Sequence, residues 1–368
     1  MKTFSGDNFA IITTQVWLFA LAVFYLSLSV RKNTDSNFLG IIISLPVLLN
    51  PLVWDVHHTI LPHSFFLSFS LFALAFFLSA FGRAWFFNLF AFGLCIGLCV
   101  ILESFGWAYL ILLVIAPSLI ARKNNCSVIK AFILPFIVCA ILVGLETATH
   151  HGVHEGQRDK LHAPHVFVSA ILMETDQQSP YAEKDPRTRI WTMIETDLAQ
   201  VRSDIWQSPD FSSRIEKLKT YEQGLRDTFA SRELNGAAAL LIKTPNELRM
   251  DIASARIVQD PLAFFYITFD HYRALWHGDP MITYPLWAMT ILCVVIGLWF
   301  WLLRARFNAM FALAFVSALA IEAQTLWIAH VGVGPADIVS VLSPLLSICF
   351  LSIILGFYIA FVSPLRND

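Results

Sequence analysis

The sequence is poor in charged residues. Only 14% of its 368 residues are Asp, Glu, Lys or Arg, whereas 57% are hydrophobic. Average soluble domains are about 25% charged. A single core in a chain of this length cannot enclose so much apolar surface, which excludes an ordinary soluble fold. Much of the chain must therefore face lipid.

Several signatures of soluble function are also missing. The sequence has no P-loop, dinucleotide-binding glycine motif or nucleophile elbow, and no basic stripe that would bind nucleic acid. Strand-type alternation does not stand out, so we predict an all-α chain. Five of the six cysteines lie in apolar runs and none lies in residues 147–282, which excludes a disulfide framework there.

We expect no cofactor. The only metal-like feature is the histidine-rich stretch 150–165, in which His151 and His154 are spaced three residues apart. It contains no recognised zinc signature such as H-E-x-x-H. A histidine-rich surface is therefore the favoured interpretation, and a divalent metal ion is the alternative.

Long apolar runs dominate the sequence instead. A helix needs roughly 20 apolar residues to cross the hydrocarbon layer, and backbone polar groups there must be bonded internally. We therefore predict a polytopic protein in which residues 1–146 form six spans, residues 147–282 a helical extracytoplasmic segment, and residues 283–368 three spans. The nine predicted transmembrane helices are at about residues 11–30, 37–54, 63–82, 85–102, 104–121, 128–146, 283–303, 307–329 and 338–361.

The positive charges of the short loops alternate along the chain. Lys or Arg occurs after the first, third, fifth, seventh and ninth predicted spans, at residues 31–32, 83, 122–130, 304–306 and 366. The intervening turns have none. Because such charges mark the cytoplasmic side, we expect the N-terminus and residues 147–282 outside and the C-terminus in the cytoplasm. The expected location is a bacterial inner (plasma) membrane, with membrane lipids as partners.

Residues 147–282 carry helix-start signals. Asp185 and Asp260 each precede a proline, which suits the first helical position. Ser213 with Glu216, and Thr244 with Glu247, have capping-box spacing. The aromatic residues of the helix after Asp260 are expected to pack against the membrane face.

Two acids at predicted outer span ends are the catalytic candidates. Asp55 lies in a short turn with His57, His58 and His63, where a carboxylate or imidazole could act as a general base and the histidines could hold a substrate. The alternative is an ordinary turn among headgroups. Glu103 lies between two apolar runs, where an acid beside lipid usually has a partner or a task. Its alternative is a loop carboxylate at headgroup depth.

Glu322 and Arg273 complete the candidate set as substrate-binding residues. Glu322 lies within a predicted span, and an intramembrane acid is a functional candidate by default. Its alternatives are a protonated acid or a bond to a neighbouring helix. Arg273 is the arginine of residues 147–282 that we favour for a lipid phosphate, because it lies close to the next span and its fork suits phosphate.

Four stretches together resemble a known family. Three pair a span with a turn: "TTQVWLFALAVFYLSLSVRKN", "IIISLPVLLNPLVWDVHHTILPHSFFLSFSLFALAFF" and "FGLCIGLCVILESFGWAYLILLVIAPSLIAR". The fourth, "SARIVQDPLAFFYITFDHYRALW", is similar to an Asn/Asp-Pro segment before the final spans. In this order they resemble the GT-C class of polytopic membrane glycosyltransferases, which includes bacterial relatives of dolichyl-phosphate-mannose protein mannosyltransferases.

The resemblance implies transfer of a sugar from a polyprenyl-phosphate carrier to an extracytoplasmic protein or glycan acceptor. Asp55 or Glu103 would then be the acid, His58 or His63 a hydroxyl or phosphate ligand, and Arg273 a contact for the lipid phosphate. The family's first span and first outer loop have no counterpart here, and Glu103 stands where the family often has arginine. A truncated or degenerate member is therefore also considered.

The sequence leaves two other classes of function open. One is a non-catalytic membrane subunit that binds an envelope partner through residues 147–282. The other is a transporter, which the sequence disfavours because its spans have few charges and no paired broken segments.

The predicted topology can be tested with single cysteines. A membrane-impermeant maleimide should label a Lys160→Cys variant in intact bacterial cells, because that position is expected outside. A Lys123→Cys variant, in a predicted cytoplasmic loop, should react only after permeabilisation. Labelling of position 160 from the cytosolic side alone would overturn the predicted orientation.

Overall fold

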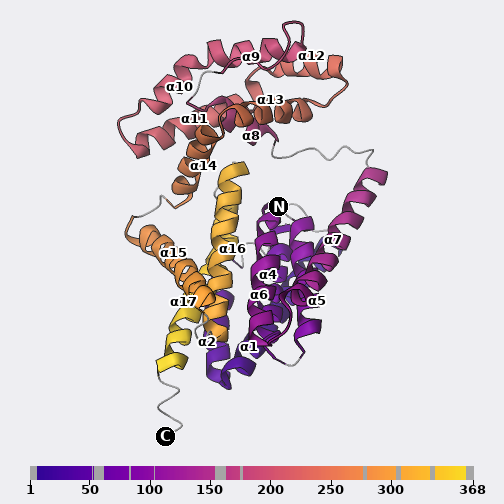
Figure 1. The fold of residues 1–368 in the computed structure, drawn as a ribbon, viewed down its shortest axis with the longest axis vertical. Helices are drawn as coiled ribbons and strands as arrows, with labels where there is room; N and C mark the ends of the chain where they lie inside the picture. Colours follow the sequence, from indigo (N-terminus) through magenta and orange to yellow (C-terminus); the bar gives the residue numbers. More distant parts are fainter. Residues whose placement is uncertain are drawn as a thin grey trace. The chain divides into compact units, whose positions relative to one another are not determined.

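The computed structural model is helical throughout the part of the chain that it describes (Figure 1). Its described residues contain no strand, so the prediction of an all-α chain is confirmed for them. They are residues 6–51, 53, 62–82, 84–102, 104–153, 163–174, 177–276, 280–303, 308–331 and 336–361.

The contacts divide the chain into two compact units. Unit 1 comprises residues 1–156, 280–324 and 334–368, and unit 2 comprises residues 157–279 and 325–333. The domain limits expected from the sequence, at residues 146 and 282, stay a prediction.

Unit 1 contains the apolar helices. α1 packs against α2 and α4, α4 against α5, and α5 against α7, whereas α17 packs against α2 and α15. The bounds are α1 Gly6–Thr34, α2 Asn37–Leu49, α4 Pro62–Ser79, α5 Trp85–Leu102, the 3₁₀ helix η1 Ser104–Ile111, α6 Leu112–Lys123, α7 Val128–Val153, α15 Pro280–Leu303, α16 Ala309–Val331 and α17 Ala336–Phe361. Residues 325–331 of α16 belong to unit 2.

Six helical stretches are long and apolar enough to cross a membrane: Ala10–Thr34, Trp85–Leu102, Gly106–Lys123, Val128–Thr149, Ala309–His330 and Leu342–Ile359. Three shorter apolar stretches, Asn37–Leu49, His63–Ser79 and Leu286–Leu298, coincide with the other predicted spans. At a rise of about 1.5 Å per residue, a 13-residue helix such as α2 covers roughly 20 Å. The chain is therefore an integral membrane protein by length and composition, and nine crossings remain a prediction.

Apolar side chains line the outside of unit 1. On α1, Trp17, Leu21 and Phe24 are more than half exposed and recur at helical spacing. α7 presents a similar stripe that includes Ile141 and Leu145. Such continuous apolar surface is unfavourable in water and suits contact with lipid.

Two glycines allow α5 to approach α7 closely. A Cβ atom on Gly93 would lie 2.5 Å from the Cα atom of Pro135, and one on Gly97 would lie 3.3 Å from the Cα atom of Cys139. Gly93 and Gly97 form a G-x-x-x-G pattern, which is typical of tightly packed membrane helices. Without side chains at these positions, the two backbones can contact each other directly.

Three asparagine side chains converge on the C-terminal end of α4. The Nδ2 groups of Asn33, Asn88 and Asn124 donate to the carbonyl oxygens of residues 78, 79 and 80, at 3.0, 3.1 and 3.2 Å respectively. The last carbonyls of a helix have no partner within the helix itself. The backbone N–H groups of Phe81 and Gly82 also reach the carbonyls of residues 78 and 79. The amides add side-chain donors to this helix end and tie α4 to three other segments of unit 1.

Unit 2 is a bundle of shorter helices with its own apolar core. α8 packs mainly against α13 and also against α11, and α14 packs against α13, α8 and α11. The bounds are α8 Ala163–Ile171, α9 Pro186–Asp197, α10 Ala199–Trp206, α11 Phe211–Thr228, α12 Ser231–Leu241, α13 Pro245–Gln259 and α14 Pro261–Leu275.

Most of the helix starts in unit 2 were predictable. Asp185 caps α9 and Asp260 caps α14, each before a proline. Thr244 and Glu247 form both bonds of a capping box at α13. The predicted cap Ser213 is wrong: α11 begins earlier, and Asp210 is its cap, accepting a 2.8 Å bond from the backbone N–H of Ser213.

Two buried arginines share one carboxylate in the core of unit 2. Arg256 is fully buried, donates through Nε to the carbonyl of Ala170 at 2.9 Å, and pairs with Oε1 of Glu195. Arg202 is 4% exposed and donates to Oε2 of Glu195 at 2.8 Å. The guanidinium of Arg256 also lies 5.2 Å from the ring centroid of Trp191. Glu195 therefore supplies the negative charge that compensates for both buried cations.

Removing that charge should loosen unit 2. In a Glu195→Gln variant two cations stay buried without their anion, and we expect a loss of roughly 3–5 kcal/mol. The measurement is amide hydrogen exchange of α9 and α13 in the purified full-length protein. Glu233→Gln is the matched control, because its partner Arg189 is largely exposed and such pairs contribute about 0–1 kcal/mol. Equal effects of the two substitutions would contradict this role for Glu195.

Candidate functional site

Most of the predicted outer-turn site lies outside the described residues. Asp55, His57, His58 and Glu103 all belong to this group, so their roles stay predictions. His63 lies in the first turn of α4 and is half-buried.

Glu322 is buried among apolar helices of unit 1. It lies on α16, is 7% exposed, and its Oε1 accepts a hydrogen bond from Oγ1 of Thr290 on α15. The same hydroxyl lies 2.8 Å from the carbonyl oxygen of Trp287. Because a hydroxyl has one proton, it can donate to only one of these oxygens at a time. The bond between Thr290 and Glu322 joins α15 to α16. It is the bond to a neighbouring helix that was one of the alternatives for Glu322.

Arg273 belongs to a compact cluster between α11 and α14 in unit 2. We call Phe211, Arg214, Asp270 and Arg273 the α11–α14 cluster. Arg214 donates to both oxygens of Asp270, at 2.7 and 3.2 Å. Arg273 lies 4.0 Å from the same carboxylate, and its guanidinium is 3.9 Å from the ring centroid of Phe211.

The α11–α14 cluster has an excess of positive charge. Asp270 is 5% exposed and is shared by two arginines, whereas the side chain of Arg273 is 45% exposed. The stacked ring and the shared carboxylate hold the guanidinium in place at the surface. A guanidinium held in this way suits a phosphate or carboxylate oxygen.

A largely buried histidine, His271, lies beside this cluster. Nε2 of His271 on α14 is 2.7 Å from Oε1 of Glu222 on α11. Burial lowers the pKa of His271, but the charge of Glu222, its hydrogen bond and a further hydrogen bond with the backbone of Ala329 outweigh that effect. The pKa of His271 is therefore raised above the ordinary value of 6.5. Protonation joins α11 and α14 through an ion pair.

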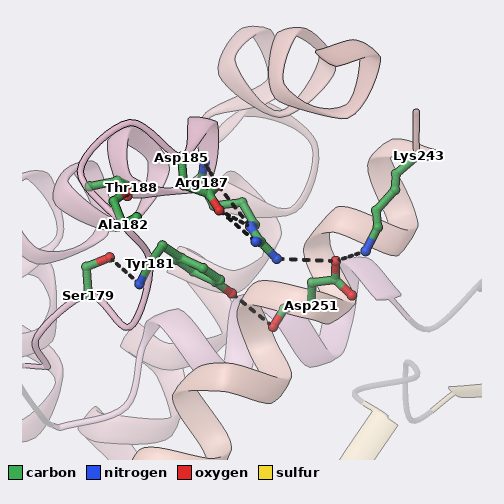
Figure 2. A network of polar contacts seen from close by, with 8 residues as sticks. All are labelled: Ser179, Tyr181, Ala182, Asp185, Arg187, Thr188, Lys243 and Asp251. Atoms are coloured by element: carbon green, nitrogen blue, oxygen red, sulfur yellow. Dashed lines mark hydrogen bonds and ion pairs between the residues drawn. The ribbon is translucent and has the colours of Figure 1, made fainter. Parts of the chain in front are cut away.

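Arg187, another arginine of unit 2, is held within a closed network (Figure 2). Its guanidinium lies 4.1 Å from the ring centroid of Tyr181 and donates to Asp185 at 2.7 Å. Asp251 lies between Arg187 and Lys243 and pairs with both. The Arg187 hydrogen bond lowers the pKa of Asp185. Because its charges face one another, this network is best explained as a structural link between α9 and α13.

No three His, Cys, Asp or Glu side chains lie together in a metal-binding arrangement in the described part of the chain. Most of the stretch 150–165 lies outside that part. The alternative of a metal ion there stays a prediction.

Comparisons of the chain with known protein families, with curated proteins and with solved structures give no match. The resemblance to GT-C glycosyltransferases therefore rests on the sequence features quoted above.

Sequence reasoning found Arg273 but missed its surroundings. Arg214 and Glu222 lie on a helix that reads as an ordinary charged surface, and their partners are 56 and 49 residues away along the chain. A usable signal was present on α14 itself. Asp270 and His271 interrupt an otherwise aromatic helix, and a charged pair in such a helix usually has a partner.

The His271–Glu222 pair should make unit 2 sensitive to pH. Since the pKa of His271 is raised by folding, the pair stabilises fully below the unfolded pKa near 6.5, and its contribution is lost as pH rises through the folded pKa. Amide exchange of α11 and α14, corrected for its intrinsic pH dependence, should therefore become faster as the pH rises through this range.

A Glu222→Gln variant tests whether the His271–Glu222 pair causes this pH dependence. It leaves the histidine buried without its anion, so the transition should move to lower pH. The Lys217–Asp204 pair, on α11 and α10, provides a control through Asp204→Asn, which should leave the transition in place. A transition unchanged in Glu222→Gln would contradict the assignment.

Proposed function

We propose that this integral membrane protein is a glycosyltransferase of the GT-C type, which transfers a sugar from a polyprenyl-phosphate donor to an extracytoplasmic acceptor. The observation that carries the proposal is the order of elements. Long apolar helices precede and follow a separately packed helical unit. A water-soluble unit inserted between membrane spans is the arrangement on which the sequence resemblance also depends.

The proposed roles follow the chemistry of the side chains. Asp55 or Glu103 acts as the base that takes the proton of the acceptor hydroxyl, and His57, His58 or His63 holds a hydroxyl or a phosphate oxygen. Arg273 contacts the phosphate of the lipid carrier. Its stacked and partly exposed guanidinium supports this role. Glu322, bonded to Thr290, helps to shape the substrate region within the spans.

The proposed orientation places the acids and unit 2 on the same side of the membrane. The N-terminus and residues 147–282 are extracytoplasmic and the C-terminus is cytoplasmic. The support is the alternation of basic residues in the short loops.

Purified full-length protein should transfer labelled sugar from a polyprenyl-phosphate donor to an envelope acceptor fraction. Asp55→Asn or Glu103→Gln should lower the rate by roughly 10²–10⁴-fold if the residue is the general base. Glu216→Gln is the matched control, since Glu216 is exposed on α11. Product is measured by mass spectrometry, and unchanged turnover in both acid variants would refute the assigned roles.

A second candidate is a non-catalytic subunit that binds an envelope protein through unit 2. It is favoured by Leu240, Ile242 and Val258, whose side chains are 74%, 95% and 80% exposed. Ile242 also adopts a left-handed backbone conformation with φ of 55°, which is costly for a β-branched residue. A stoichiometric partner together with an absence of sugar transfer would favour this second function.

A further inference from the structure

α14 has a continuous apolar stripe on its exposed side. The exposed fractions of Leu262, Phe265, Tyr266 and Phe269 are 59%, 59%, 55% and 41%. With spacings of three, one and three residues, these side chains share one face of the helix. Phe265 and Phe269 stack with their rings 11° apart and 6.0 Å between centroids. We call these four residues the α14 stripe.

The opposite face of α14 is already occupied by unit 2. Phe264, Ile267 and Asp270 are buried there, and His271 contacts Glu222 of α11. The helix therefore cannot rotate to bury its stripe without exposing core residues and breaking the Arg214–Asp270 pair. The α14 stripe is a surface that unit 2 itself leaves uncovered.

Two features tie α14 to the edge of the membrane. The first is chain length: three residues separate Trp276, at the end of α14, from Pro280, where the 24-residue apolar helix α15 begins. The four steps of chain from Trp276 to Pro280 span at most about 14 Å. The C-terminal end of α14 therefore lies close to the place where the chain enters the apolar helix.

The second feature is a contact within unit 2. The ring of Phe264 packs edge-on against His330, with 5.3 Å between centroids, and the backbone of Ala329 lies near enough to His271 to help raise its pKa. Ala329 and His330 end the apolar stretch Ala309–His330, which is one of the six candidate spans. α14 is thus attached at both its middle and its end to residues expected at a membrane boundary.

We propose that α14 is an interfacial helix whose stripe lies on the lipid bilayer, among the headgroups and the upper acyl chains. Aromatic side chains favour this depth because their rings are apolar and their polar edges can remain hydrated. Arg273 lies on the same face, four residues beyond Phe269, where a cation meets the lipid phosphates. This lipid contact goes beyond the proposed activity and does not depend on it.

A fluorescent probe can report the contact in the full-length protein. Cys126 is the one half-buried cysteine, and the other five are buried, so Cys126→Ser gives a low background. Phe265→Cys or Phe269→Cys is then labelled with an environment-sensitive dye. The protein is reconstituted in vesicles of zwitterionic and anionic phospholipids, with and without quencher groups on the upper acyl chains.

We expect blue-shifted emission and at least about twofold quenching at both stripe positions, because an interfacial helix buries its apolar face by about 5–10 Å. A probe at Gln223→Cys, exposed on the polar face of α11, should show neither effect. Labelled variants are first compared with the parent by circular dichroism, so that a misfolded protein is not scored. Stripe probes that behave like the Gln223→Cys probe would overturn the proposal.

The same variants distinguish lipid from a second copy of the chain. If the stripe instead packed against a partner protomer, Phe265→Cys would form an intermolecular disulfide on mild oxidation and its probe would be shielded from lipid quenchers. Either result would overturn the lipid contact. Loss of sugar transfer would not, since quenching is measured independently of any reaction.

Discussion

A backbone carbonyl or amide without a partner costs several kcal/mol in hydrocarbon, and unit 1 is organised around this constraint. Its helices satisfy most such groups internally, but the last carbonyls of each helix need other donors. At the end of α4 those donors are the backbone N–H groups of the following turn and the side chains of Asn33, Asn88 and Asn124. One set of hydrogen bonds thus ends a helix and also fixes the positions of three neighbouring segments.

Unit 2 meets a different constraint, because it buries charge. Arg202 and Arg256 enter its core, and Glu195 compensates for both. The pairing draws α9, α10 and α13 together and leaves Arg256 stacked near Trp191. In unit 1 the buried carboxyl group of Glu322 is instead hydrogen-bonded to a neutral group, the Thr290 hydroxyl. Buried polar groups are thus held by ion pairs in unit 2 and by a neutral hydroxyl in unit 1, the unit with the more apolar surface.

What could be predicted from the sequence was local. Apolar runs located the helices of unit 1, and the caps at Asp185, Thr244 and Asp260 follow from bonds within a single turn. The cap at Ser213 was misplaced because Asp210 makes the equivalent bond three residues earlier. The pairing of Glu195 with Arg256 joins residues 61 apart, and no local pattern indicates it. For the candidate site, sequence selected Arg273 but could not predict Phe211 beneath it or Arg214 beside it.

α14 combines a buried charge with exposed apolar side chains. In a water-soluble bundle the aromatic residues of this helix would face inward and Asp270 would face solvent. Here only some of the aromatic residues, such as Phe264 and Tyr272, face the core. Asp270 is 5% exposed, whereas Phe265, five residues earlier, is 59% exposed. Burying Asp270 is tolerable because Arg214 compensates for its charge. Exposing Phe265 and its neighbours to water is unfavourable, and the proposed contact with lipid would remove that cost.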